Sequence, residues 1–265
     1  MGRTCLVVQG AGKYVYSMKI KPEDKCILMF SGGRDSTISA VCLSGTFKHL
    51  TLVTVLSEHL VGIERVYERV IQLKKHLPKG TEWLQVIQPK IPVIKILKYA
   101  TCLPCQHAYI IIGVMIAKRL QISNLALGYA GYQNSWPEQT PYSTRQLKKL
   151  LKNFGINLRL PAYDTKKKED AISKLIQLGL ESESYEQKCL RQSSNVELKG
   201  DILKSEIDRW INCIDKTIKS IDNVQINTWL RVKIEDVMDT NLLKNTGGVR
   251  TGEAVDRIIT GGVMW

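Results

Sequence analysis

The sequence lacks the long apolar runs and the signal-like start that mark membrane or exported proteins. A membrane-spanning helix needs roughly 20 consecutive apolar residues. The most apolar stretch covers only residues 109–117 and is followed directly by Lys118 and Arg119. The first residues include Arg3 but neither a long apolar core nor a cleavage site of small residues. We therefore expect a cytoplasmic protein without a membrane partner.

Acidic residues are scarce relative to basic ones. The 265 residues include 25 Asp and Glu against 38 Lys and Arg, which gives a formal net charge of +13. This balance suits a polyanionic partner, either a nucleic acid such as tRNA or the triphosphate of a nucleotide. The lysines are scattered rather than gathered into one block, so a generally lysine-rich surface is the alternative interpretation.

Short apolar segments alternate with helical periods through the middle of the chain. Strands are expected at residues 26–30, 49–57, 82–88, 124–128 and 157–160, and helices at residues 35–44, 63–76, 105–120, 141–154 and 166–178. Strands that alternate with helices at this spacing form a parallel sheet covered on both faces. The pattern predicts an α/β fold with a doubly wound parallel sheet.

Four segments are expected along the chain. Residues 1–23 alternate around a Gly-rich turn and predict an N-terminal β-hairpin, and residues 24–192 form the α/β domain. Residues 193–240 carry an apolar stripe at helical spacing, which predicts a helical extension. Residues 241–265 contain Thr-Gly-Gly-Val twice and predict a Gly-rich tail, with an active-site lid as the alternative. The extension offers a surface for a homodimer or for a second protein.

One loop, between the first buried strand and the following helix, carries the main functional signal. It consists of Ser31, Gly32, Gly33, Arg34, Asp35 and Ser36. The free N–H groups and the dipole at a helix start favour an anion at this point, and glycines allow the backbone to approach it closely. The serine hydroxyls add donors, and Asp35 can hold a Mg²⁺ ion that bridges phosphates. An incidental glycine turn is the structural alternative.

The loop also lacks two common nucleotide-binding endings. It has no Gly-Lys-Ser/Thr of a Walker loop, and no Gly-x-Gly-x-x-Gly fingerprint follows this strand. Ser-Gly-Gly-x-Asp-Ser instead resembles the signature of the PP-loop ATP pyrophosphatases, which include tRNA thiolases, tRNA lysidine synthetases, GMP synthetase and 7-cyano-7-deazaguanine synthase. The resemblance implies that the loop grips the β- and γ-phosphates while a substrate oxygen attacks the α-phosphorus. Pyrophosphate then leaves, and ammonia or sulfide displaces AMP.

Three further stretches within residues 24–190 resemble 7-cyano-7-deazaguanine synthase. They are Leu103 to His107 followed by a strand ending in Gly128, then Trp136-Pro137-Glu138-Gln139, and finally Lys168 ahead of Cys189. This resemblance implies catalytic roles for Asp35 and Lys168 and an ATP contact at Gly128. It also implies that a deazapurine-like base contacts Gln106, His107, Trp136 and Glu138. That family's zinc-binding cluster of four cysteines and its Arg-Asn pair are not present here.

Cysteine spacing points to a different branch of the same superfamily. Seven cysteines without a secretory signal argue against a disulfide framework, and Cys102 and Cys105 place two thiols on one turn. Together with Cys189 they resemble the three-cysteine pattern of iron–sulfur-dependent tRNA thiolases, which implies a [4Fe–4S] cluster with one iron open for sulfur. Adding Cys213 would give four thiolates suited to a structural Zn²⁺. Ordinary thiols are the third interpretation.

Three functions remain open on these grounds. The leading hypothesis is an enzyme that uses ATP and Mg²⁺ to adenylate a carboxylate or amide on a small base, as in queuosine-type deazapurine chemistry. The second is a tRNA 2-thiolation enzyme with an iron–sulfur cluster. The third is a non-catalytic nucleotide-binding subunit of a larger assembly.

Overall fold

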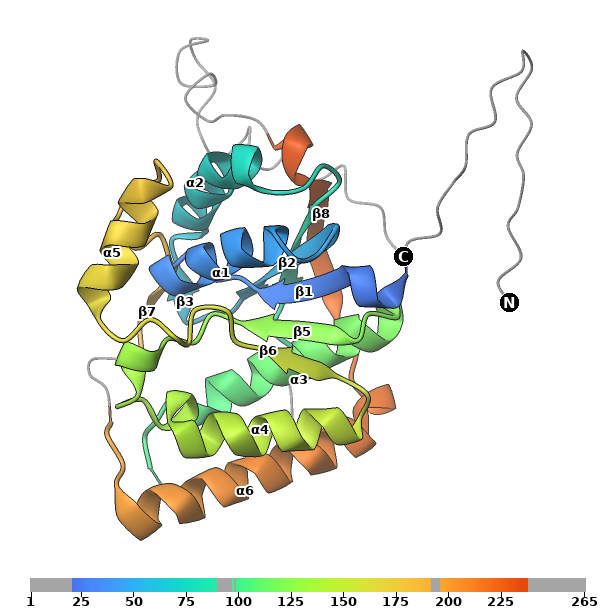
Figure 1. Cartoon of the computed structure of the whole chain (residues 1–265). Coiled ribbons are helices and arrows are strands. Elements are labelled where there is room, and N and C mark those ends of the chain that lie inside the picture. Colours follow the sequence, from blue (N-terminus) through green and yellow to red (C-terminus); the bar gives the residue numbers. More distant parts are fainter. Residues whose placement is uncertain (1–20, 90–96, 98, 192–195, 238–265) are drawn as a thin grey trace, which may run out of the picture.

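A single six-stranded sheet organises the structure (Figure 1), a computed structural model that describes residues 21–89, 97, 99–191 and 196–237. The strands lie in the order β6-β5-β1-β2-β4-β8, and all neighbours are parallel except the edge pair β4–β8. Their bounds are β1 (Lys25–Met29), β2 (His49–Leu56), β4 (Glu82–Ile87), β5 (Asn124–Leu127), β6 (Asn157–Arg159) and β8 (Asn227–Lys233). The predicted β-hairpin and Gly-rich tail lie outside the described residues.

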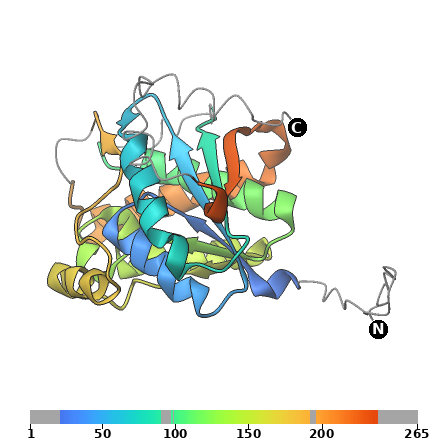
Figure 2. The same ribbon diagram turned by 90° about the horizontal axis from the view of Figure 1, so that it is seen from above.

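Helices cover both faces of this sheet, as Figures 1 and 2 show from two directions. They are α1 (Arg34–Ser44), α2 (Ile63–Leu73), α3 (Leu103–Leu120), α4 (Pro141–Asn153), α5 (Lys168–Gln177) and α6 (Gly200–Lys219). Alternate residues of β1 point to opposite faces. Ile27 and Met29 join a core built with α3, α4 and α6, whereas Cys26 and Leu28 join a core built with α1, α2 and α5. The predicted doubly wound α/β fold is confirmed.

The strand order creates a switch point beside β1. From β1 the chain moves through α1 to β2 on one side, whereas β5 lies on the other side of β1 and is reached through α3. In open α/β sheets the crevice at such a point, outside the carboxyl ends of the strands, is where ligands bind. The predicted phosphate loop follows β1 and Gly128 follows β5, so both lie at this crevice.

The segment after residue 195 completes the sheet as well as one helical layer. The apolar stripe of α6 is buried as predicted, with Ile207, Trp210 and Ile214 fully enclosed against the α3–α4 side. β8 then pairs antiparallel with β4, which was not expected, so the predicted helical extension also supplies an edge strand. Within the described parts of the chain, no helix combines the length and apolarity required to cross a bilayer.

Candidate functional site

Two glycines shape the loop between β1 and α1, one through its backbone conformation and one through the space that it leaves. Gly32 has φ +79°, and a Cβ atom there would lie 2.8 Å from the carbonyl oxygen of Tyr185. A Cβ atom on Gly33, the N-cap of α1, would lie 2.8 Å from Oε2 of Glu186. The glycines therefore permit both the left-handed turn and the close approach of a second segment.

Gly128 brings the end of β5 against the start of α1. A Cβ atom at Gly128 would lie 2.7 Å from Cα and 2.8 Å from N of Ser36. These are backbone atoms at a helix start, and they cannot move aside as the end of a flexible side chain can. The missing side chain of Gly128 thus sets the spacing between the two halves of the crevice.

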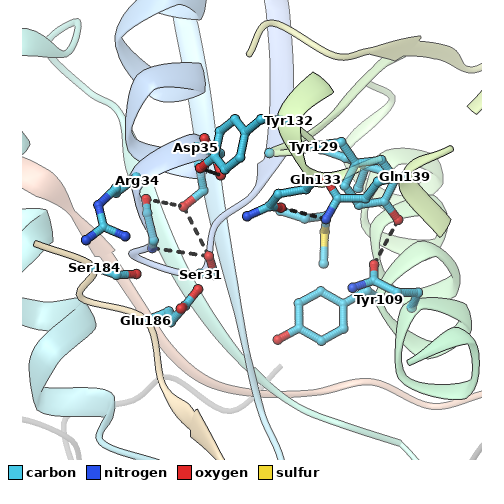
Figure 3. Close-up of a pocket in the computed structure, with 16 residues that line it drawn as sticks. Ser31, Arg34, Asp35, Tyr109, Tyr129, Tyr132, Gln133, Gln139, Ser184 and Glu186 are labelled. Atoms are coloured by element: carbon cyan, nitrogen blue, oxygen red, sulfur yellow. Dashed lines mark hydrogen bonds between the residues drawn. The ribbon is translucent and has the colours of Figure 1, made fainter. Parts of the chain in front are cut away.

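A cavity of about 230 Å³ lies over this loop (Figure 3). Its lining comprises the phosphate loop, Gln106 and Tyr109 of α3, Gly128 with the tyrosines and glutamines that follow β5, and Ser184 with Glu186. Figure 3 shows Tyr132 above Asp35 on one side, and Tyr109 facing Ser184 and Glu186 across the space. Four of the predicted phosphate-binding residues have side chains on this wall, namely Ser31, Arg34, Asp35 and Ser36.

Asp35 is a carboxylate with one oxygen still unsatisfied. It is only 7% exposed, and the hydroxyl of Tyr132 donates to its Oδ2 at 2.7 Å. Its Oδ1 has no hydrogen-bond partner among the described residues. Burial chiefly raises the pKa of Asp35 to about 6, with the Tyr132 hydrogen bond opposing and the charge of Glu186 adding to the rise. A divalent cation would favour the ionised form and satisfy the open oxygen.

Residues 181–186, here called the strap, are tied across the phosphate loop by three arginines. The guanidinium groups donate to strap carbonyls: Arg34 to Ser182 at 2.6 Å, Arg65 to Ser184, and Arg69 to Glu181 at 2.9 Å and to Glu183 at 2.6 Å. Arg69 is fully buried, and its guanidinium lies 4.5 Å from the ring centre of Tyr185. Charge-assisted bonds of this kind are stronger than neutral ones. They fix Glu186 over Gly33, a position that no motif in the sequence had indicated.

Three of the four predicted metal-binding cysteines lie together beside the cavity. Cys102 and Cys105 belong to the start of α3, and Cys189 belongs to β7 (Lys188–Cys189), which pairs with β3 (Leu60–Val61). Burial raises the pKa of Cys102 to about 12, with further contributions from Glu138 and from the other two thiols. The pKa of Cys105 is raised by burial and by Cys189. Gln106, the neighbour of Cys105, lines the cavity itself.

His59 joins this group and was not predicted. Its Nε2 lies 3.6 Å from the Sγ of Cys105, and its Nδ1 lies 2.7 Å from the hydroxyl of Ser57. Only the pairing of β3 with β7 brings it there, because the amide of Leu190 donates to the carbonyl of His59 at 2.9 Å. Burial lowers the pKa of His59, and Arg191 adds to this effect. A single histidine far from Cys105 in sequence carries no local signal of this contact.

Cys213 and His107 lie on the other side of α3. Residues that are two positions apart in a helix are separated by about 200° around its axis. His107 therefore faces away from the direction of Cys105. The His107 Nε2 lies 3.1 Å from the hydroxyl of Thr217 on α6, and the same hydroxyl donates to the carbonyl of Cys213 at 2.9 Å. The structure therefore does not bring Cys213 to the other three thiols, and His107 does not line the cavity.

The other residues predicted to contact a base substrate are dispersed. Gln106 lines the cavity and accepts a hydrogen bond from the hydroxyl of Tyr129 at 2.9 Å. Glu138 is 2% exposed, its Oε2 has no partner among the described residues, and burial raises its pKa to about 7. Trp136 is half-buried, and Lys168 is exposed at the start of α5. None of these last three lines the cavity.

Cys102, Cys105 and Cys189 are the candidate ligands for a metal ion or cluster. In residues 21–89, 97, 99–191 and 196–237, no three His, Cys, Asp or Glu side chains are arranged to hold a single ion. A tetrahedral zinc site needs sulfurs only about 2.3 Å from one centre. A four-iron cluster is larger than one ion and accepts more widely separated thiolates. Cys102, Cys105 and Cys189 are therefore not arranged around a single ion such as zinc.

Comparisons with known proteins give matches in structure only. No family model and no curated protein matches the sequence. One similar structure is the U34-tRNA thiolase NcsA from Methanococcus maripaludis with its [4Fe-4S] cluster, at 14% identity and a TM-score of 0.43, covering 76% of this chain and 72% of that one. Another is a predicted subunit of tRNA methyltransferase from Methanocaldococcus jannaschii, at 14% identity and a TM-score of 0.35, covering 65% of this chain and 99% of that one. Likeness at this level identifies no activity.

Proposed function

We propose that the chain is an ATP-dependent tRNA-modifying enzyme that activates a nucleotide oxygen by adenylation and replaces it with sulfur. The observation that carries the proposal is the convergence of three thiols, from the start of α3 and from β7, next to the cavity over the phosphate loop, which Gln106, the neighbour of Cys105, lines. Neither the phosphate loop nor the three thiols alone would specify thiolation. Side by side, they provide a site for ATP and a site for sulfur chemistry, and such a reaction needs both.

The phosphate loop binds and orients ATP in this account. The amides at the start of α1 and the hydroxyls of Ser31 and Ser36 hold the β- and γ-phosphates, while Asp35 and Glu186 are the carboxylates placed to hold Mg²⁺. The substrate oxygen attacks the α-phosphorus and the bond to pyrophosphate breaks. Catalysis of this step rests on positioning and charge stabilisation rather than on an enzyme nucleophile.

Cys102, Cys105 and Cys189 would hold the cluster. A bound cluster would supply the sulfur chemistry, by which sulfur replaces the adenylated oxygen and AMP is the leaving group. The protein's own contribution is to orient the thiols. His59 directs its Nε2 at Cys105 and is itself held by Ser57, an arrangement that fixes the thiol's direction.

The interpretation as a 7-cyano-7-deazaguanine synthase has less support from the site. It rests on side chains that do not meet in the cavity, because Glu138 is enclosed next to the thiols and Lys168 is exposed on α5. A small base would have only Gln106 among the four contacts predicted for it. Thiolation uses the residues that the fold does bring together.

Anaerobic reconstitution with iron and sulfide tests the cluster. We expect a brown protein with visible absorbance, lost in Cys105→Ser and Cys189→Ser and retained in the matched control Cys213→Ser. The ATP half is tested by adding ATP, Mg²⁺ and tRNA and measuring AMP and pyrophosphate. A colourless protein with one tightly bound zinc, or pyrophosphate release stimulated by 7-carboxy-7-deazaguanine rather than tRNA, would contradict the proposal.

A further inference from the structure

The solvent face of α4 is uniformly basic. Arg145, Lys148, Lys149 and Lys152 are all exposed, and their spacing places them side by side on one face of the helix. Leu147 and its apolar neighbours on the opposite face are buried. The helix contains no acidic residue. We call these four residues the α4 ridge.

Within the part that the structure describes, no acid forms an ion pair with the ridge. Every ion pair found there, at up to 4.0 Å, lies on other elements. The neighbouring helix α6 shows the contrast, because three of its four bases pair with acids one turn away: Lys204 with Asp201, Arg209 with Glu206, and Lys219 with Asp215. A chain-wide preference for lysine would have treated both helices alike. Among the described α-helices without an acidic residue, α4 carries the most bases: it has four, whereas α3 has only Lys118 and Arg119.

The ridge is unfavourable for the helix that carries it. Arg145 with Lys149, and Lys148 with Lys152, are like charges four residues apart, and such pairs destabilise a helix. The helix dipole favours cations only in the last turn, where Lys152 lies. A partner that supplies negative charge would relieve the repulsion along the ridge.

The position of α4 connects the ridge to the ATP cavity. Gln139 lines the cavity, and Thr140 directly after it caps α4 by accepting a hydrogen bond from the amide of Ser143 at 3.2 Å. The hydroxyl of Tyr163 donates to the carbonyl of Gln139 at 2.7 Å and holds this junction. At 1.5 Å per residue the ridge runs from roughly 9 to roughly 20 Å beyond Gln139. Figure 1 shows α4 lying along the sheet beside β6.

We propose that the α4 ridge binds the phosphodiester backbone of the RNA whose nucleotide is modified in the cavity. This inference rests on the proposed function, which makes RNA the substrate. A nucleic-acid duplex carries roughly one charge per 2 Å of its axis, so a ridge about 10 Å long meets several phosphates. Such contacts set the position of the RNA without reading its sequence. The ridge therefore positions the substrate along α4 with the target nucleotide at the cavity.

Salt-dependent RNA binding tests the ridge. The variant replaces all four residues by Gln, which has a similar helix propensity to Lys and Arg. The matched control replaces four exposed lysines on other elements (Lys48, Lys75, Lys79 and Lys233) by Gln, so both proteins lose the same charge. Binding of a tRNA transcript is measured without ATP at several salt concentrations, and circular dichroism confirms that both variants are folded.

We expect the ridge variant to bind the transcript about tenfold or more weakly, and its log–log salt slope to shrink by about three, since each lost phosphate contact removes roughly 0.7–0.9. The control should keep the wild-type slope, and ATP binding should be unchanged in both. Equal losses in the two variants, or no loss in either, overturn the proposal. So does a ridge variant that loses binding to phosphatidylserine vesicles but not to RNA. Because no ATP is present, failure of ATP splitting leaves this result unaffected.

Discussion

Replacing Gly128 by alanine tests whether the close contact between β5 and α1 sets the geometry of the proposed ATP site. The new Cβ atom would lie 2.7 Å from Cα of Ser36, whereas ordinary van der Waals contact begins at 3.4 Å. The strand end and the helix start must therefore separate by about 0.7 Å. Both are backbone elements of the packed crevice, so no side-chain rotation can absorb the change.

Two effects of different size follow from this displacement. Overpacking of a well-packed region typically costs about 1–3 kcal/mol of the free energy of unfolding. Displacement of reacting groups by roughly 1 Å can cost about 100-fold in rate. We therefore expect Gly128→Ala to fold with modestly reduced stability and to lose most of its ATP-splitting activity.

Urea unfolding and pyrophosphate release measure the two effects. Gly45→Ala is the matched control, because its Cβ atom would meet only the carbonyl oxygen of Cys42 at an ordinary 3.6 Å, and its backbone is in the right-handed helical region. That control should be neutral in both measurements. A Gly128→Ala protein with wild-type activity and stability would refute the assignment of this contact.

Three further variants test the charges around the loop. Folding raises the pKa of Asp35 from 3.8 to about 6. The folded nucleotide-free protein therefore binds a proton at Asp35 more tightly than the unfolded chain does. As the pH rises from 4 through 6, the free energy of unfolding should fall by up to about 3 kcal/mol. Urea midpoints against pH should show this fall and lose it in Asp35→Asn. Glu186→Gln should raise the Mg²⁺ concentration needed for half-maximal ATP binding; tighter ATP binding without Mg²⁺ would instead indicate that the carboxylate merely blocks the loop. Arg69→Met removes two charge-assisted bonds to the strap and should cost about 3 kcal/mol in urea unfolding; an unchanged midpoint would contradict the strap's role.

Periodicity predicted the central elements well because each is long and bounded by turn residues. The strand expected at residues 49–57 occurs as β2, and the helix expected at 105–120 occurs as α3 with Pro104 in its first turn. β8 was not predicted, since its residues are mostly exposed and one charged residue, Arg231, pairs with Glu82 across the edge. An exposed edge strand has no apolar alternation to reveal it.

The residues of the candidate site also divide into those that the sequence could predict and those that it could not. The position of the loop expected to bind phosphate could be predicted, because its residues are contiguous in sequence and follow a buried strand. Glu186 and His59 were not, since each reaches the site through a long-range backbone contact: Tyr185 with Gly32, and Leu190 with His59. Cys213 was added to the other thiols only to complete a set of four, and the number of cysteines does not tell which side of α3 each of them lies on.

The central claim is that ATP splitting serves sulfur insertion into RNA. The most direct measurement incubates the anaerobically reconstituted protein with ATP, Mg²⁺, a sulfide source and tRNA, and compares the pyrophosphate released with the sulfur found in the tRNA by mass spectrometry. The account predicts equal amounts of the two, AMP as the nucleotide product, and loss of both products in Asp35→Asn and Cys189→Ser. Release of ADP and phosphate, or pyrophosphate release without any sulfur in the tRNA, would contradict it.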